Sequence, residues 1–149
     1  MFTDFFKRLT SSAPDRLPPL DARLALGALL VRVAKADNSY VFLEIARIDR
    51  ILGLRYGLNP IDAAKLRATC EAIEHEAPDT VRFTRAIKEA VPYEDRTSVM
   101  EALWEIVLAD GARDAEEDAM LRMVAPLLGI EDQDSAIIRQ RVEARLAKS

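Results

Sequence analysis

The feature of this sequence that most constrains its fold is an internal repeat. When the sequence is shifted by 73 positions, residues 19–44 align with residues 92–117 without a gap. Each copy begins with a proline, continues through an apolar periodic segment to an Ala-Asp pair, and reaches a glutamate seven residues after the aspartate. A duplicated helical hairpin is the simplest explanation, and two such hairpins facing each other form a helical bundle.

The aligned positions include the residues expected to shape the turn in each copy. After a gap of one residue, Gly57-Leu58 also aligns with Gly129-Ile130. We therefore place repeat 1 at about residues 19–58 and repeat 2 at about residues 92–130. The aligned pairs are Pro19 and Pro92, Arg23 and Arg96, Leu30 and Leu103, Ala36 and Ala109, Asp37 and Asp110, and Glu44 and Glu117.

The spacing of apolar residues predicts an all-α protein, a bundle of about seven to eight helices with an internal pseudo-two-fold repeat. Apolar residues recur every three or four positions between sparse glycines and prolines, with little strict alternation. Residues 1–19 form an amphipathic segment and a linker, and residues 20–149 form one helical domain. Pro126 is expected to kink or end its helix near Ala125. The longer helices are expected at about 20–36, 41–54, 60–76, 79–91, 93–109, 114–128 and 134–147.

Composition excludes several classes of protein. Half of the residues are hydrophobic and 31% are charged, which is typical of a globular domain. The formal net charge of −4 argues against a nucleic-acid partner. The longest apolar stretch, Leu24 to Val31, is far shorter than the roughly 20 residues that a membrane-spanning helix needs. A single cysteine excludes an internal disulfide and suits a reducing compartment, so we expect a cytoplasmic protein with no transmembrane segment.

The second copy of the turn concentrates oxygen ligands. Asp110 ends one predicted helix, Gly111 allows the chain to reverse, and Asp114 and Glu117 lie in the first turn of the next helix. Carboxylates and free carbonyls around one tight turn are the ligands that hard cations such as Ca²⁺ or Mg²⁺ prefer. The alternative is structural, because Asp114 and Glu117 also have the spacing of a capping box. The spacing does not match the calcium-loop pattern.

The first copy keeps part of this pattern. Asp37 and Glu44 occupy the positions of Asp110 and Glu117, and Asn38 replaces the glycine. Val41 stands at the position of Asp114 and has no oxygen to offer. If either turn binds an ion, we expect the second copy to bind it more strongly.

The duplicated Ala-Asp turn with a following glutamate resembles the TerB family of tellurite-resistance domains. The matching stretches are Leu26 to Leu58 and Val99 to Ile130, and the likeness extends over most of the chain from Leu20 onward. The resemblance implies an all-helical, two-fold pseudo-repeated bundle and a role in the response to tellurite or other chemical stress. It also implies acidic clusters that are candidates for binding metal ions. Carried over by position, these are Asp37 and Glu44 in repeat 1, and Asp110 and Glu117 in repeat 2, joined by Asp114.

The resemblance and the composition together predict a non-enzymatic stress-response domain. The cofactor expected is a divalent metal ion (Ca, Mg or Zn), and the partners expected are proteins, including membrane-bound members of a resistance system. Two further possibilities are left open, namely that the protein attaches to the surface of a membrane and that it forms a homodimer. The alternative is a purely structural protein-interaction adaptor without an ion site, whose acidic turns are helix caps.

Two other groups of residues have both a functional and a structural interpretation. Cys70, Glu71, Glu74 and His75 lie on one predicted helix, where a zinc site competes with a solvated Glu–His pair beside a partly buried cysteine. No glycine-rich phosphate loop or nucleophile turn supports an enzyme. At the N-terminus, an apolar stripe adjoins two basic residues and could pack on the bundle, remain disordered, or dock on a membrane or partner. The stripe consists of Phe2, Phe5, Phe6 and Leu9, and the basic residues are Lys7 and Arg8.

In the last helix, the periodicity places one apolar face toward the core and basic residues toward solvent. Ile137, Ile138, Val142 and Leu146 are expected to point inward. The basic residues suit the C-terminal end of a helix, where the dipole is negative.

Overall fold

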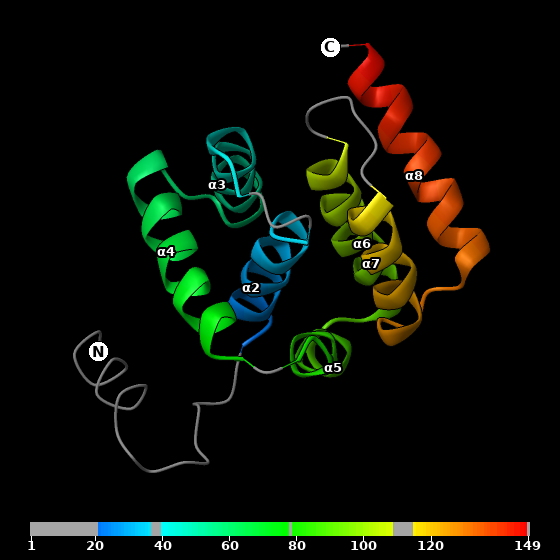
Figure 1. Cartoon of the computed structure of the whole chain (residues 1–149), viewed down its shortest axis with the longest axis horizontal. Helices are drawn as coiled ribbons and strands as arrows, with labels where there is room; N and C mark the ends of the chain where they lie inside the picture. Colours follow the sequence, from blue (N-terminus) through cyan, green and yellow to red (C-terminus); the bar gives the residue numbers. More distant parts are fainter. Residues whose placement is uncertain (1–20, 37–39, 78, 109–114, 149) are drawn as a thin grey trace.

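The structure, a computed structural model of the chain, describes residues 21–36, 40–77, 79–108 and 115–148. Over these residues it contains seven α-helices and no strand, which confirms the predicted all-α bundle (Figure 1). The predicted N-terminal segment, residues 1–19, lies outside the described residues. The helices are α2 (Ala22–Ala34), α3 (Phe42–Tyr56), α4 (Pro60–Glu76), α5 (Val81–Ala90), α6 (Tyr93–Val107), α7 (Ala115–Leu127) and α8 (Asp132–Ala147).

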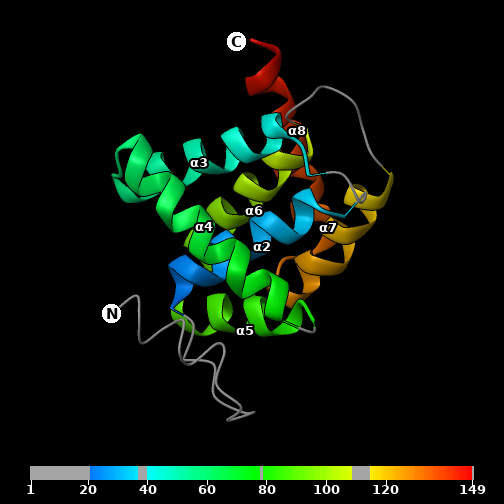
Figure 2. The ribbon, with the colours of Figure 1, turned by 60° about the vertical axis from the view of Figure 1, so that its left-hand side comes forward.

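Helix α2 lies at the centre of the bundle. It packs against α3, α4, α5, α6 and α7, while α8 packs on α6 and α7 (Figures 1 and 2). Nine of the 13 residues of α2 are buried, including every residue from Ala25 to Val31. Because these seven residues span almost two turns, this part of α2 is buried on all sides, and such a helix is stable only when it is surrounded.

Local sequence signals explain where α4 and α2 begin. Asn59 accepts a hydrogen bond from the Asp62 amide through its side chain (2.8 Å), and Pro60 follows as the first residue of α4. Asp21 caps α2 in the same way, accepting from the Leu24 amide at 2.8 Å. These caps satisfy amides that have no partner within their own helix.

Helices α3 and α7 end in the same way. Gly57 and Gly129 both adopt left-handed backbone conformations, with φ of 65° and 76°. The next amide in each copy bonds back across the turn, from Leu58 to the Gly53 carbonyl (2.9 Å) and from Ile130 to the Ala125 carbonyl (2.8 Å). This hydrogen bond, five residues back, is the mark of a Schellman cap, for which glycine is preferred because it has no Cβ.

The helix boundaries show the same offset as the aligned sequence. The last residues of α2 and α6, Ala34 and Val107, are 73 positions apart, and so are Phe42 and Ala115, the first residues of α3 and α7. The two hairpins therefore correspond at the boundaries on either side of the turn and in the glycine caps that end α3 and α7. The ancestral duplication itself stays a prediction.

The structure bears on two local predictions and corrects the second. Helix α7 continues through Pro126 and ends at Leu127, two residues after Ala125, and the alternative expectation of a kink at Pro126 stays a prediction. In α8, Ile138 and Val142 are buried as expected, but Ile137 is exposed, with 45% of its surface accessible. The inward face of α8 is narrow because the helix covers only α6 and α7 at the edge of the bundle.

None of the helices in the described ranges has both the length and the apolar character needed to cross a membrane.

The closest approach of α2 to α4 depends on Gly27. A Cβ atom at this position would overlap the Cys70 side chain of α4, whose thiol also lies 3.7 Å from the Leu24 carbonyl oxygen. Cys70 itself is completely buried. The absence of a side chain at Gly27 thus sets the separation between the central helix and α4.

We predict that Gly27→Ala lowers the free energy of unfolding, although alanine is intrinsically favoured over glycine in a helix by about 1 kcal/mol. Overpacking of a buried site typically costs about 1–3 kcal/mol, and here the added methyl meets a buried sulfur. Urea unfolding measures the change. Because the clash is with Cys70, Gly27→Ala should lower the free energy of unfolding by less in a Cys70→Ala background. Strictly additive effects of the two substitutions on this free energy would contradict the interpretation.

Candidate functional site

The helices that follow the two acidic turns begin at one end of the bundle. Figures 1 and 2 both place the first residues of α3 and α7 near the end at which α2 and α6 finish. Glu44 and Glu117 occupy the first turns of α3 and α7, so both lie at this end. The other three predicted ligands, Asp37, Asp110 and Asp114, lie outside the described residues.

Glu44 and Glu117 are buried carboxylates, 9% and 4% exposed. Burial of a carboxylate is unfavourable unless polar groups surround it, so two such residues at matching positions are unusual. Glu44 Oε1 accepts a hydrogen bond from the Val41 amide at 3.2 Å, as the glutamate of a capping box does. Val41 offers no side-chain oxygen in return, so the first copy contains only half of the box.

The two copies differ in the residues that open the second helix. Val41, Phe42 and Leu43 in the first copy align with Asp114, Ala115 and Glu116 in the second. All three apolar side chains of the first copy are exposed, and Phe42 is 82% exposed. The first copy thus has an apolar surface where the second copy is acidic.

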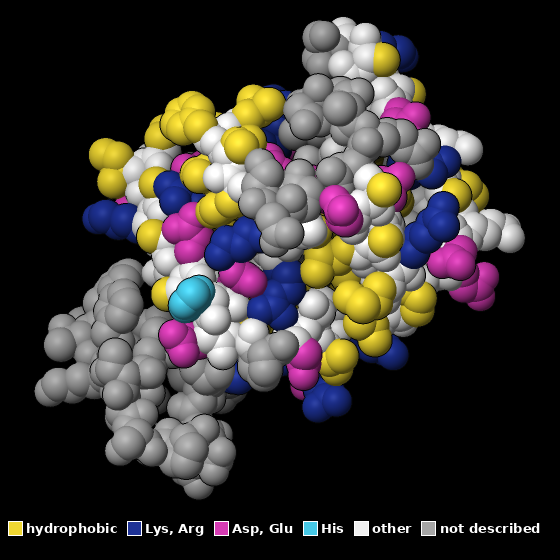
Figure 3. All heavy atoms as spheres, viewed as in Figure 1, with side chains coloured by type: hydrophobic (Ala, Val, Ile, Leu, Met, Phe, Trp, Pro, Cys, Tyr) yellow, Lys and Arg dark blue, Asp and Glu magenta, His cyan; other side chains and the backbone are white. Residues whose placement is uncertain are grey.

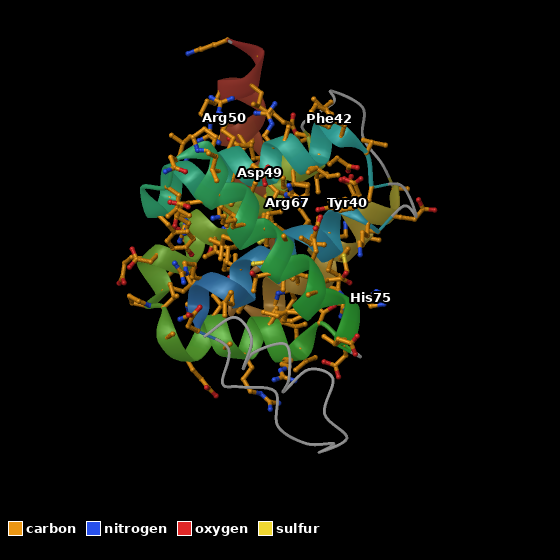
Figure 4. All side chains as sticks on the ribbon, turned by 90° about the vertical axis from the view of Figure 1, so that its left-hand side faces the viewer. Tyr40, Phe42, Asp49, Arg50, Arg67 and His75 are labelled. Atoms are coloured by element: carbon orange, nitrogen blue, oxygen red, sulfur yellow. The ribbon has the colours of Figure 1, made fainter. Side chains whose placement is uncertain are left out.

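A polar network lies directly beside the first turn. The Tyr40 hydroxyl donates to Glu71 Oε2 at 2.6 Å, and Arg67 Nη1 lies 3.2 Å from both Glu71 oxygens. Arg67 Nε donates in turn to Asp49 Oδ1 at 2.7 Å. Figure 4 shows Tyr40, Arg67 and Asp49 on the same side of the molecule. The network therefore joins Tyr40, which follows the turn, to α4 through Glu71. It also joins α4 to α3 through Arg67 and Asp49.

Tyr40 acts in this network as a hydrogen-bond donor. Burial raises the pKa of its phenol far above the ordinary value, and the hydrogen bond to the Glu71 carboxylate raises it further. The hydroxyl therefore keeps its proton at any physiological pH. Its role is to hold the chain after the turn against α4, and it is unsuited to act as a base or nucleophile.

A second set of contacts centres on Glu74, which is 8% exposed. Lys35 Nζ lies 2.9 Å from Glu74 Oε1, and Arg32 Nε lies 3.1 Å from Oε2. Burial alone would raise the pKa of Glu74, but hydrogen bonds from Lys35 and Arg32 and the positive charges of both outweigh it, so the pKa is lowered. Glu74 is therefore ionised and holds Arg32 of α2 together with Lys35, the residue that caps the end of α2.

Arg32 also reaches the end of α4 and the following helix. Its Nη2 donates to the carbonyl oxygens of Glu74 (3.0 Å) and of Ala77 (2.8 Å), the residue that caps the end of α4. The Glu74 carbonyl also accepts the Ala77 amide at 3.2 Å. Its guanidinium lies 5.2 Å from the centre of the Phe83 ring in α5. One side chain therefore joins α2, α4 and α5.

The structure separates the residues of the second candidate site on α4. Cys70 is fully buried rather than partly buried, and burial raises the pKa of its thiol to about 12. Glu71 bonds to Tyr40 and Arg67 rather than to His75, which is exposed and points away from the network (Figure 4). Arg67 precedes Glu71 by one helical turn, and this i,i+4 spacing was the sequence signal that could have revealed the pair.

A hollow of about 310 Å³ lies between α6, α7 and α8, and sequence reasoning did not predict it. Trp104 lies beneath it and donates from Nε1 to Ser135 Oγ at 3.2 Å, while the Arg139 guanidinium lies 5.8 Å from the indole ring. Arg122 and Asp132 line its rim, so both signs of charge are present.

Within the described ranges, no three His, Cys, Asp or Glu side chains are grouped closely enough to hold a metal ion. The described residues contribute only Glu44 and Glu117 from the five predicted ligands, one from each copy.

We predict that Glu74→Gln lowers the free energy of unfolding at pH 7 by about 1–3 kcal/mol, the usual contribution of hydrogen bonds to a charged group. Because the pKa of Glu74 is lower in the folded than in the unfolded state, its charge stabilises the fold above the ordinary value of 4.5. That contribution is lost as the pH falls through the lower, folded-state pKa. Urea unfolding between pH 3 and pH 8 measures the free energy of unfolding of variant and wild type. The difference between the two free energies should become smaller at acidic pH.

Glu76→Gln provides the matched control, because Glu76 is an exposed glutamate two residues further along α4. It should change stability little at any pH. An equal effect of both substitutions would show that the Lys35–Glu74–Arg32 contacts do not stabilise the fold.

Comparison with models of protein families relates this architecture to known proteins. Residues 23–140 match one family, described as Tellurite resistance protein TerB. The match includes Glu44, Glu117, the Tyr40 network and all seven helices, α2 without its first residue and α8 in part. No curated protein and no solved structure matched the chain. With most of its length matched by the family model, the chain belongs to the TerB family.

Proposed function

We propose that this chain is a non-enzymatic TerB-type stress-response domain that binds a divalent cation at the second acidic turn and acts with partner proteins. The observation that supports the proposal best is the pair of buried glutamates, Glu44 and Glu117, at matching positions of two corresponding hairpins. The helices that carry them in their first turns, α3 and α7, begin at the same end of the bundle (Figure 2), and in the sequence the remaining acidic residues shortly precede each helix.

The second turn is the stronger candidate for the ion. Asp110, Asp114 and Glu117 together supply three carboxylates within eight residues, and hard cations such as Ca²⁺ and Mg²⁺ favour such oxygen ligands. The first copy has Val41 in place of Asp114, and Glu44 already accepts the Val41 amide. Asp37 and Glu44 are therefore expected to bind an ion more weakly, or to serve only as structural residues.

The properties of the reactive side chains favour a function without catalysis. The Cys70 thiol is inaccessible and has a raised pKa, which disfavours the thiolate form needed for nucleophilic attack. The Tyr40 hydroxyl is already bonded to Glu71. We therefore propose that the protein acts by binding, with protein partners that include membrane-bound members of a resistance system, from a cytoplasmic location.

A second candidate function is a structural adaptor without an ion site. The contact between the Val41 amide and Glu44 favours it, because the glutamate there behaves as a helix cap. The exposed apolar residues at the start of α3, Val41, Phe42 and Leu43, would then provide a surface for a partner.

Thermal melting with millimolar Ca²⁺, Mg²⁺, Mn²⁺ or Zn²⁺ tests the ion proposal. An ion present at about 100 times its dissociation constant should stabilise the native state by about 2.7 kcal/mol and raise the melting temperature. We predict that Asp110→Asn combined with Glu117→Gln removes this ion-induced shift. The readout is the shift on adding the ion, so any change in stability that the substitutions cause without ion is subtracted.

Two controls locate the site. Glu116→Gln alters an exposed neighbour of Glu117 and should preserve the shift. Asp37→Asn with Glu44→Gln alters the first turn and should preserve most of it. A shift that survives Asp110→Asn with Glu117→Gln places the ion elsewhere, and the absence of a shift with every ion favours the adaptor.

A further inference from the structure

An apolar groove of about 400 Å³ lies between α3 and the start of α4. Its lining is mostly apolar, and its two charged residues are Asp49, which is already paired with Arg67, and the exposed Arg50. Leu54 at its edge is 76% exposed, and Ile61 beside it is 69% exposed. Figure 3 shows hydrophobic side chains gathered on the surface over α3 and the beginning of α4. The apolar lining consists of Ala46, Gly53, Leu54, Leu58, Pro60 and Ala63.

The exposed apolar surface at this groove is unusual for the described part of the chain. Leu54 and Ile61 are two of the three most exposed large hydrophobic side chains there, and the third, Phe42, lies on the same helix as Leu54. Large apolar side chains clustered beside a groove mark a surface that is covered in the functional state. The apolar lining of the groove favours an apolar occupant, either a helix or an extended segment.

The chain carries such an occupant in its own N-terminal sequence. Phe2, Phe5, Phe6 and Leu9 have the i, i+3, i+4, i+7 spacing of the apolar face of a helix. Amphipathic helices with this spacing bind in apolar grooves through three or four anchoring side chains. Lys7 and Arg8 fall between the anchors and would remain in solvent.

The connection between this segment and the groove is short. Asp21 and Arg23, at the start of α2, lie close enough to Tyr56 at the end of α3 for their charges to act on its phenol. The groove is lined by residues of α3 from Ala46 onward and by the start of α4, so one end of it lies close to this point. Residues 10–20 separate Leu9 from Asp21, and 11 extended residues span up to about 36 Å. The 15 residues of α3 cover only about 22 Å, so the linker reaches all of the groove.

We propose that the α3–α4 groove is the docking site of the chain's own N-terminal segment, with Phe2, Phe5, Phe6 and Leu9 facing Leu54, Leu58 and Ile61. A tethered segment experiences an effective concentration of about millimolar. A second copy of the chain at micromolar concentration competes poorly with it. The proposal is independent of any ion at the acidic turns.

A spin label on the segment tests the docking in the full chain. Cys70 is buried and its thiol pKa is raised to about 12, so an introduced cysteine is labelled selectively. A nitroxide attached at Thr3→Cys should reduce the NMR intensities of amides at Ala46, Gly53, Leu58 and Ala63. Amides near Ile137 on α8 should keep theirs. Unchanged intensities around the groove overturn the proposal.

Substitutions then identify the contact. Phe5→Ser combined with Phe6→Ser should abolish the loss of intensity, and so should Leu54→Glu, which alters an exposed side chain and should leave the fold intact. Ile137→Glu, at another exposed apolar residue, is the matched control and should change nothing. Equal effects of Leu54→Glu and Ile137→Glu would contradict docking in this groove.

Two mixing experiments exclude the other occupants. In the first, chain that is enriched in ¹⁵N but carries no nitroxide is mixed with spin-labelled ¹⁴N chain. Its amide NMR intensities should not fall, because the contact lies within one molecule. A loss in the mixture identifies a second copy as the occupant and overturns the proposal. A loss that occurs only after vesicles containing anionic lipid are added assigns the segment to a membrane surface and overturns it as well.

Discussion

The fold depends on the burial of α2 from every side. A helix whose residues from Ala25 to Val31 are all buried cannot remain in water, so the other helices must form a shell around it. Gly27 sets how closely α4 approaches, because a side chain there would occupy the space of Cys70. Helices α3 and α5 follow from this placement, since both pack on α2, and α6 and α7 close the opposite side. Burial of α2 thus determines how the other helices are arranged around it.

Polar contacts then fix the end of the bundle at which the candidate site lies. Arg32 and Lys35, at the end of α2, form ion pairs with Glu74. Tyr40, just after the first turn, donates a hydrogen bond to Glu71. The corresponding turn of the second copy leads into the acidic start of α7. The two hairpins therefore share a scaffold but differ in chemistry, as expected when one copy of a repeat keeps a role and the other changes.

Much of the fold could be predicted from the sequence because its signals are local. Asn59-Pro60 and Gly57 act within a few residues, and they mark the boundary between α3 and α4 correctly. The central position of α2 could not be predicted, because periodicity does not show whether a short apolar helix is covered on one side or on all. The Tyr40–Glu71 bond joins residues 31 positions apart and depends on the packing of α4, which no local pattern encodes. Of the candidate site, the sequence identified the acidic positions, and the structure adds the burial of Glu44 and Glu117.

Arg32 has a consequence for how the molecule opens. Its guanidinium bonds to the carbonyls of Glu74 and Ala77 at the end of α4, pairs with the Glu74 carboxylate and covers the Phe83 ring, so separating α4 or α5 from the central helix removes partners from a mostly buried cation. Even a small separation of α4 or α5 from α2 is therefore unfavourable in free energy. Slow breathing motions should instead be confined to the α7–α8 edge, and the three helices that meet at this guanidinium should exchange their amide hydrogens as a single unit.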